Sequence, residues 1–206
     1  MILQINATRM ELLRLKKRIK LAIRGHKLLK DKQDELMRQM LGMINEVKDM
    51  RLTIERDFRQ ILEGFMLAQS EMGPYQVDEA LALPTKKLSV SVETKNLMSV
   101  KIPVFTKEVE GDIISYGYLN TSGEMDVSLI KFEKLIETLL NLAEKEKTVQ
   151  LLADEIEKTR RRVNALEYKL IPNLQDTIHF ITMKLSEMER SNLTRLMKVK
   201  DIVRGH

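Results

Sequence analysis

The chain has 206 residues, of which 32% are charged and 4% aromatic, and it contains neither Trp nor Cys. Without Cys, a disulfide framework and a thiolate metal site are excluded. The apolar residues are Leu, Ile, Val, Ala and thirteen Met, which suit narrow contacts between helices better than a thick globular core. With only eight Gly and four Pro, the composition is typical of long helices.

The formal net charge of +5 is compatible with an acidic partner, which could be a nucleic acid, a membrane surface or a protein. The N-terminal residues Met1–Asn6 are too few before the first charges to form a signal peptide. No apolar run approaches the roughly 18 residues that span a bilayer. We therefore expect no direct membrane insertion.

The first segment, residues 1–73, carries a heptad pattern. Alternating steps of three and four from Leu12 to Ala68 meet an apolar residue at thirteen of seventeen positions. A repeat of this kind is typical of a coiled coil. The sequence Met72-Gly73-Pro74 predicts the end of the helix. The residues expected in the contact between helices are Leu15, Ile19, Leu29, Leu36, Val47 and Ile54.

Residues 74–126 have a different pattern. Apolar and polar residues alternate over Lys87–Glu93 and again over Met98–Val104, which predicts two strands of a β-hairpin. The turn is expected at Thr94-Lys95-Asn96. A head of this size is too small for a core of its own, so we expect it to pack on the helices.

The third segment, residues 127–206, is predicted to be a second coiled-coil helix that begins at Asp126 or Ser128. Its apolar stripe begins Phe132, Ile136, Leu139, Ala143, Val149, Ile156. Steps of four between Leu166 and Ile178 form a stutter that contains Pro172, and this predicts a bend or a loosened turn without a break. The residues expected in the helix contact are Val163, Leu166, Leu170, Ile178, Ile181 and Leu185. The predicted fold is mainly α, a long antiparallel two-helix coiled coil with a small β-hairpin head inserted between the helices.

The sequence offers little for catalysis. It contains no phosphate-binding loop of the G-x-x-x-x-G-K-[ST] type and no G-x-G-x-x-G motif. The three His residues have no ligand spacing, and His26 falls in the predicted helix contact, where a structural role is favoured. We therefore expect no catalytic, cofactor-binding or metal-binding residue, and no enzyme activity of the chain on its own.

Basic residues concentrate near both ends of the chain. Residues 8–32 contain ten basic and two acidic side chains, and residues 184–204 contain six basic and three acidic ones. An antiparallel pair of helices places these windows at the same end, which favours a functional basic tip over ordinary solvation. The candidate tip interface is Arg9, Arg14, Lys16, Lys17, Arg18, Lys20, Arg24, Lys198 and Lys200.

A second cluster contains three consecutive arginines. On a helix they fan over about 200°, so at least one faces away from the helix contact. The simpler interpretation is a solvated face, and the alternative is a contact with another subunit. The candidate subunit interface is Arg160, Arg161, Arg162, Asn164 and Glu167.

The same residues carry a resemblance to a known family. Thr8–Arg18 and Arg24–Leu36, with the motif R-G-H-K-L-L-K, resemble the N-terminal helix of the D subunit of V-type and archaeal A-type ATPases. The run R-R-R-V-N-A-L-E at 160–167, followed by Ile171-Pro172, is similar to the C-terminal signature of that family. Residues 95–101 and 116–119 in the head also resemble it, whereas Ala7 departs from a Pro that is frequent there.

The resemblance implies a non-catalytic central-stalk subunit, the rotor shaft of a V-type ATPase or ATP synthase. It implies rotation transmitted between a ring of A and B subunits and a membrane ring that moves H⁺ or Na⁺. The implied partners are the A and B subunits, the small F subunit and the funnel subunit above the membrane ring. The implied location is the cytoplasmic side of the membrane, as a peripheral part of the complex, without cofactors.

Two other functions remain open from the residues alone. A basic coiled-coil arm could bind nucleic acid, although the basic window lacks the aromatic side chains that stack on single-stranded bases. A coiled-coil scaffold protein is the other alternative. The resemblance predicts neither, and on that basis no nucleic acid partner is expected.

Overall fold

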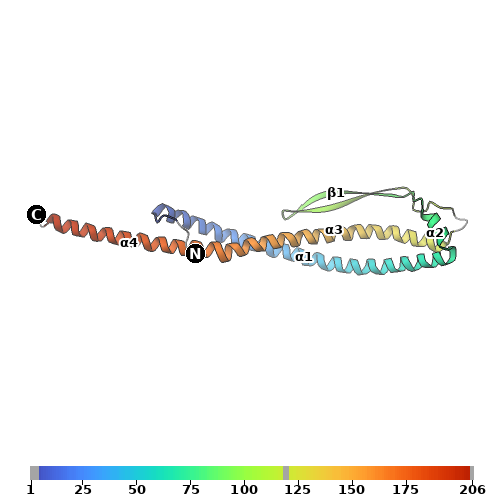
Figure 1. Cartoon of the computed structure of the whole chain (residues 1–206), viewed down its shortest axis with the longest axis horizontal. Coiled ribbons are helices and arrows are strands. Elements are labelled where there is room, and N and C mark those ends of the chain that lie inside the picture. Colours follow the sequence, from blue (N-terminus) through green and yellow to red (C-terminus); the bar gives the residue numbers. More distant parts are fainter. Residues whose placement is uncertain (1–4, 118–120, 205–206) are drawn as a thin grey trace. The chain divides into compact units, whose positions relative to one another are not determined.

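The computed structural model describes residues 5–117 and 121–204. Residues 1–4, 118 and 119, which the sequence predictions included, lie outside that part. The elements are α1 (Arg9–Met72), α2 (Pro74–Leu81), β1 (Lys87–Leu97), β2 (Val100–Glu110), α3 (Gly123–Ala165), the π-helical turn η2 (Leu166–Leu170) and α4 (Ile171–Arg204), as Figure 1 shows. Long helices with a two-stranded antiparallel hairpin between them confirm the predicted fold class. The short helix α2 has no counterpart in the sequence prediction.

The chain divides into two compact units. One, which we call the terminal unit, joins the residues up to Glu35 with those from Ile156 onward. The other, the hairpin unit, is Leu36–Glu155. This division differs from the predicted segments 1–73, 74–126 and 127–206, which follow the order of the chain. Contacts between antiparallel helices join residues distant in sequence, so each unit combines parts of α1 with parts of a later helix.

The core of the terminal unit lies between α1 and α4. Leu15 and Ala22 of α1 cluster with Leu174 and Ile181 of α4, all with at most 9% of their surface exposed. Two contacts show that the helices are antiparallel. Arg9 Nη2 lies 2.5 Å from Glu189 Oε1, whereas His26 Nε2, later in α1, lies 3.4 Å from Oε2 of Glu167, which comes earlier in the chain than Glu189. Burial of each large aliphatic side chain contributes roughly 1.5–3 kcal/mol. This apolar contact is the main stabilisation of the unit.

The helix from Gly123 to Arg204 is continuous through η2. Val163, Leu166 and Leu170 follow the alternating steps of three and four, which would place the next core residue at position 173. The next buried residue is instead Leu174, one position later. A π turn accommodates one additional residue without breaking the helix. The predicted stutter is therefore accommodated as a π turn.

Pro172 follows this turn directly. In a regular α-helix its ring would meet the carbonyl of Tyr168, four residues earlier, and one backbone hydrogen bond would be lost. The wider π turn separates these groups. The loosened turn without a break, expected at Pro172, is confirmed.

In the hairpin unit, α1 packs against α3. Ile54 and Ile61 contact Leu135 and Leu142 in one buried cluster. The predicted stripe was wrong here, because Phe132 and Leu139 leave 36% and 37% of their surface exposed. The residues that contact α1, Leu135 and Leu142, each lie one position before a residue of the predicted stripe. The α3 segment therefore has apolar residues on two faces. The second of these faces lies beneath the hairpin.

Gly64 of α1 lies against Ser128 of α3. A Cβ atom built there would lie 2.5 Å from Oγ of the buried Ser128, whereas a Cβ at Gly42, also in α1, would meet nothing within 4 Å. Packing therefore requires a glycine at position 64 but not at position 42.

We expect Gly42→Ala to stabilise the chain by about 0.8–1 kcal/mol, because alanine restricts the unfolded backbone more than glycine does. Gly64→Ala in the same helix should show no such gain, since the new methyl group displaces Ser128. Urea unfolding followed by circular dichroism measures both. Combining Gly64→Ala with Ser128→Ala should recover the gain, and equal stabilities of the two single variants would contradict this account.

The head begins where α1 ends. Gly73 has a φ of 84°, and Pro74 opens α2 at a position where its missing N–H costs nothing. The predicted start of the second helix at Asp126 or Ser128 was wrong, since α3 begins at Gly123. Its cap is Ser122, whose Oγ accepts a hydrogen bond from the N–H of Glu124 at 3.3 Å.

The hairpin turn lies later than predicted. Strands β1 and β2 pair from Lys87↔Glu110 to Leu97↔Val100, so Thr94, Lys95 and Asn96 are strand residues. The two-residue turn is Met98-Ser99, with φ values of 50° and 73°. Positive φ at both positions matches the right-handed twist of the strands.

Candidate interaction surface

The basic candidate residues of the terminal unit are exposed along α1 and α4. All nine candidate tip residues are exposed: Arg9, Arg14, Lys16, Lys17, Arg18, Lys20, Arg24, Lys198 and Lys200. Two have acidic neighbours, since Arg9 pairs with Glu189 and Arg14 Nη1 lies 3.4 Å from Glu11 Oε1. Exposed pairs of this kind are worth at most about 1 kcal/mol, so these cations remain able to engage an acidic partner.

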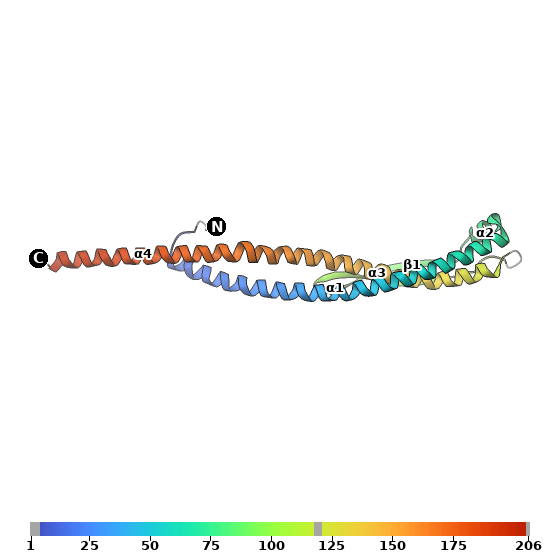
Figure 2. The same cartoon turned by 90° about the horizontal axis from the view of Figure 1, so that it is seen from below.

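The last part of α4 carries exposed apolar side chains. Because Glu189 lies beside Arg9 at the start of α1, the residues after it extend beyond α1 (Figures 1 and 2). The 15 residues from Arg190 to Arg204 are about 22 Å of helix. The apolar side chains there, between 55% and 71% exposed, are Leu193, Leu196, Met197, Val199, Ile202 and Val203.

This apolar surface was not predicted from the sequence. The last residue expected in the helix contact was Leu185, and only Lys198 and Lys200 were singled out as interface residues beyond it. The signal was present, since six apolar residues occur between positions 193 and 203 among basic ones. We call the basic and apolar surface of residues 190–204 the C-terminal surface.

The arginine cluster lies on α3 of the terminal unit. Arg160, Arg161 and Arg162 are exposed, and Arg161 pairs with Glu157 one turn earlier. Asn164 is also exposed. The remaining member, Glu167, lies in η2, where its Oε2 is 3.4 Å from Nε2 of His26. His26 is thus half-buried beside a carboxylate of the facing helix, and Glu167 has a partner inside the unit.

The residues expected in the helix contact are all buried or half-buried. In the terminal unit these are Leu15, Ile19, Leu29, Val163, Leu166, Leu170, Ile178, Ile181 and Leu185. In the hairpin unit they are Leu36, Val47 and Ile54. They form the supporting core, so the candidate surfaces are carried by two helices that fix each other.

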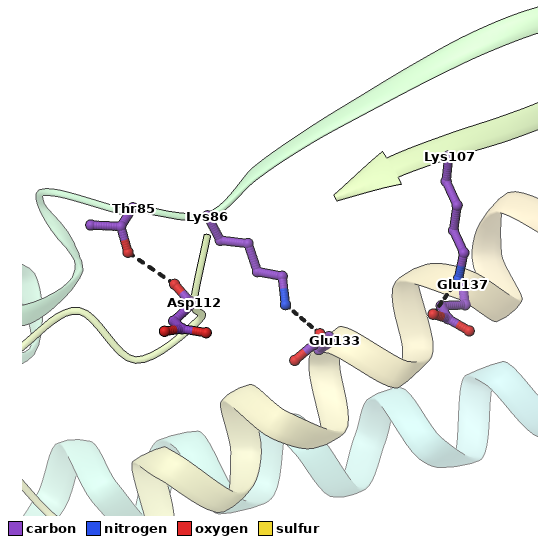
Figure 3. A network of polar contacts seen from close by, with 6 residues as sticks. All are labelled: Thr85, Lys86, Lys107, Asp112, Glu133 and Glu137. Carbon is purple, nitrogen blue, oxygen red and sulfur yellow. Dashed lines mark hydrogen bonds and ion pairs between the residues drawn. The ribbon is translucent and has the colours of Figure 1, made fainter. Parts of the chain in front are cut away.

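The hairpin is held on α3 by three glutamates. Lys86 pairs with Glu133 and Lys107 pairs with Glu137 (Figure 3). Farther along β2, the backbone N–H of Phe105 donates to Oε2 of Glu144 at 3.0 Å. Residues spaced by four and by eleven share one helix face, so the glutamates form a stripe that the sequence reasoning missed.

Within residues 5–117 and 121–204, no three His, Asp or Glu side chains gather as they would to hold a metal ion. In the same part of the chain, no helix is both long and apolar enough to cross a membrane.

An antiparallel helix pair with an inserted β-hairpin and an exposed basic, apolar end defines a coiled-coil structural subunit. The model of a protein family described as the D subunit of ATP synthase matches residues 11–201. The V-type ATP synthase D subunit of Fusobacterium nucleatum is 52% identical over 204 residues, which are 98% of this chain and 97% of the relative. The proteins of the same name from Clostridium botulinum and Acetivibrio thermocellus are 52% and 50% identical, covering 98% of this chain and 95% and 93% of their own lengths. The chain belongs to the family of ATP synthase D subunits.

These relatives give no support to a nucleic-acid-binding arm or to a coiled-coil scaffold protein.

Proposed function

We propose that this chain is the rotor shaft in the central stalk of a V-type ATP synthase, a non-catalytic subunit that transmits torque. Its family membership over residues 11–201 carries this proposal. A shaft must resist twisting, and two helices joined by an apolar contact resist it better than one. ATP chemistry and ion movement would occur on other subunits, where rotation of this chain biases each catalytic site in turn.

The C-terminal surface and the basic residues of α1 are the proposed contact with the ring of A and B subunits. Exposed cations of the shaft would be attracted to acidic groups of the ring. Because each exposed ion pair is weak in water, these pairs would not hold the shaft in one rotational position. The apolar side chains from Leu193 to Val203 supply sliding contacts that have no directional bond to break. Together these properties suit a surface that must turn inside its partner.

Two further contacts with other subunits are part of the proposal. The exposed arginines 160–162 with Asn164 are the proposed contact for a neighbouring subunit, the small F subunit being the candidate. The funnel subunit above the membrane ring would bind the opposite part of the stalk. The chain would be a peripheral part, on the cytoplasmic side, of a membrane-bound complex that moves H⁺ or Na⁺.

Removing residues 195–206 tests the proposal. In a complex reconstituted with the truncated chain, we expect the ratio of ATP-driven ion transport to ATP hydrolysis to fall several-fold. The reason is that a shortened shaft contacts the catalytic ring over less surface. Transport and hydrolysis are measured on the same proteoliposomes.

A stability measurement serves as the control. The side chains of residues 195–204 are exposed, so the truncated chain should unfold at the same urea concentration as the intact one. Unchanged coupling in a complex that has incorporated the truncated chain would contradict the proposed contact.

A further inference from the structure

A cavity of about 230 Å³ lies under the root of the hairpin. Its walls come from four elements: Leu81 from α2, Leu88 and Val109 from β1 and β2, and Phe132 and Ile136 from the second apolar face of α3. All belong to the hairpin unit. The cavity explains why the Phe132 face of α3 is apolar although it does not contact α1.

The polar groups around the cavity already have partners. Lys86 and Lys107 reach across from the hairpin to Glu133 and Glu137, as Figure 3 shows. Ser115 Oγ donates to the carbonyl of Leu83 at 3.1 Å. Tyr116 donates its hydroxyl proton to Asp126 Oδ1 at 2.5 Å. A molecule in the cavity would therefore meet no unpaired charge and would need no polar group.

The volume is sufficient for a ligand. An apolar cavity of about 150 Å³ engineered in another protein stays dry and binds benzene or xenon. An empty apolar space also leaves its wall atoms without dispersion contacts on one side. This pocket is partly open, since Leu88 and Val109 leave 43% and 46% of their surface exposed, and an apolar molecule in it would cover that apolar surface.

We propose that this cavity is a binding site for a small, uncharged, apolar molecule of one aromatic ring or a short alkyl chain. Leu88 and Val109 lie on the hairpin, and Phe132 and Ile136 lie on α3, so the ligand contacts both sides of the joint. It binds the docked hairpin better than a released one and therefore stabilises docking. The inference does not depend on the proposed function.

Toluene is the probe. Titrated into the full-length chain with ¹³C-labelled methyl groups, it should shift the resonances of Leu88, Val109 and Ile136 saturably. Exposed methyl groups such as Leu193 should shift little. Some backbone amides of the hairpin exchange with solvent only when the hairpin is released from α3. At a toluene concentration of about ten times the Kd, their exchange should slow about tenfold.

Ala80→Leu provides the variant that fills the cavity, since Ala80 is part of its wall. It should abolish the toluene shifts while leaving hairpin amides as protected as before or more so. Ala143→Leu, at an exposed position of α3, should bind like the unaltered chain. If Ala80→Leu does not fold, Ile136→Phe replaces it.

No saturable shift at the limit of toluene solubility would overturn the proposal. So would shifts that survive in the folded cavity-filling variant, or shifts spread equally over exposed methyl groups.

Discussion

Replacing Ile181 with alanine is expected to lower the free energy of unfolding of the terminal unit by about 2–5 kcal/mol. Ile181 has no exposed surface and contacts the cluster of Leu15, Ala22 and Leu174 between α1 and α4. Truncation removes the transfer energy of three carbons and leaves a void that two rigid helices cannot close. The shift is read from urea unfolding followed by far-ultraviolet circular dichroism.

Leu193→Ala is the matched control. It removes a similar volume from the same helix, but Leu193 is 58% exposed and outside the cluster, so its cost should stay within about 0.5 kcal/mol. Similar losses for both variants would show that α4 does not pack on α1 through Ile181.

Deleting a single residue is expected to cost much more stability in α1 than in η2. Removing Lys20 from α1 rotates everything before it by about 100° relative to Ala22, which turns Leu15 out of the core. We expect a loss of about 2–5 kcal/mol, comparable to truncating that leucine. Removing Lys169 from η2 together with Pro172→Ala should cost less than about 1.5 kcal/mol, because the π turn can become a regular turn without changing the register of α4.

Both deletions remove one exposed lysine, and measuring Pro172→Ala alone separates the effect of the second deletion from that of the proline substitution. Urea unfolding and the secondary-structure signal of the folded chain measure the difference. Equal destabilisation by the two deletions would mean that η2 does not hold the additional residue of the repeat.

The long helix α1 could be predicted because its signals agree with one another. A heptad repeat continues without proline until Met72-Gly73-Pro74, and the helix ends at Met72 as that sequence requires. The π turn could also be located, since a stutter and Pro172 coincide. In both places one local signal was supported by a second.

The hairpin turn could not be placed because its residues carry no turn signature. Met98 and Ser99 are neither Gly nor Asn, although both adopt positive φ. Thr94-Lys95-Asn96 has the more turn-like composition, but pairing of the alternating strands beyond it extended the ladder to Leu97 and Val100. The tertiary pairing overrode the local preference.

The α3 stripe failed for a different reason. Residues 129–142 carry apolar side chains on two faces, with Leu135 and Leu142 toward α1 and Phe132 and Ile136 toward the hairpin. A periodicity search finds both faces but cannot say which one meets which partner. The C-terminal surface was missed because its apolar residues contact no other part of the described chain.

That uncovered end of α4 has a practical consequence for handling the protein. A helix that presents Leu196, Met197 and Val203 to water should make the purified chain scatter light increasingly as it is concentrated, and more so in high salt, where repulsion among its lysines and arginines is screened. Co-expression with whatever normally covers those side chains should raise the yield of monodisperse material.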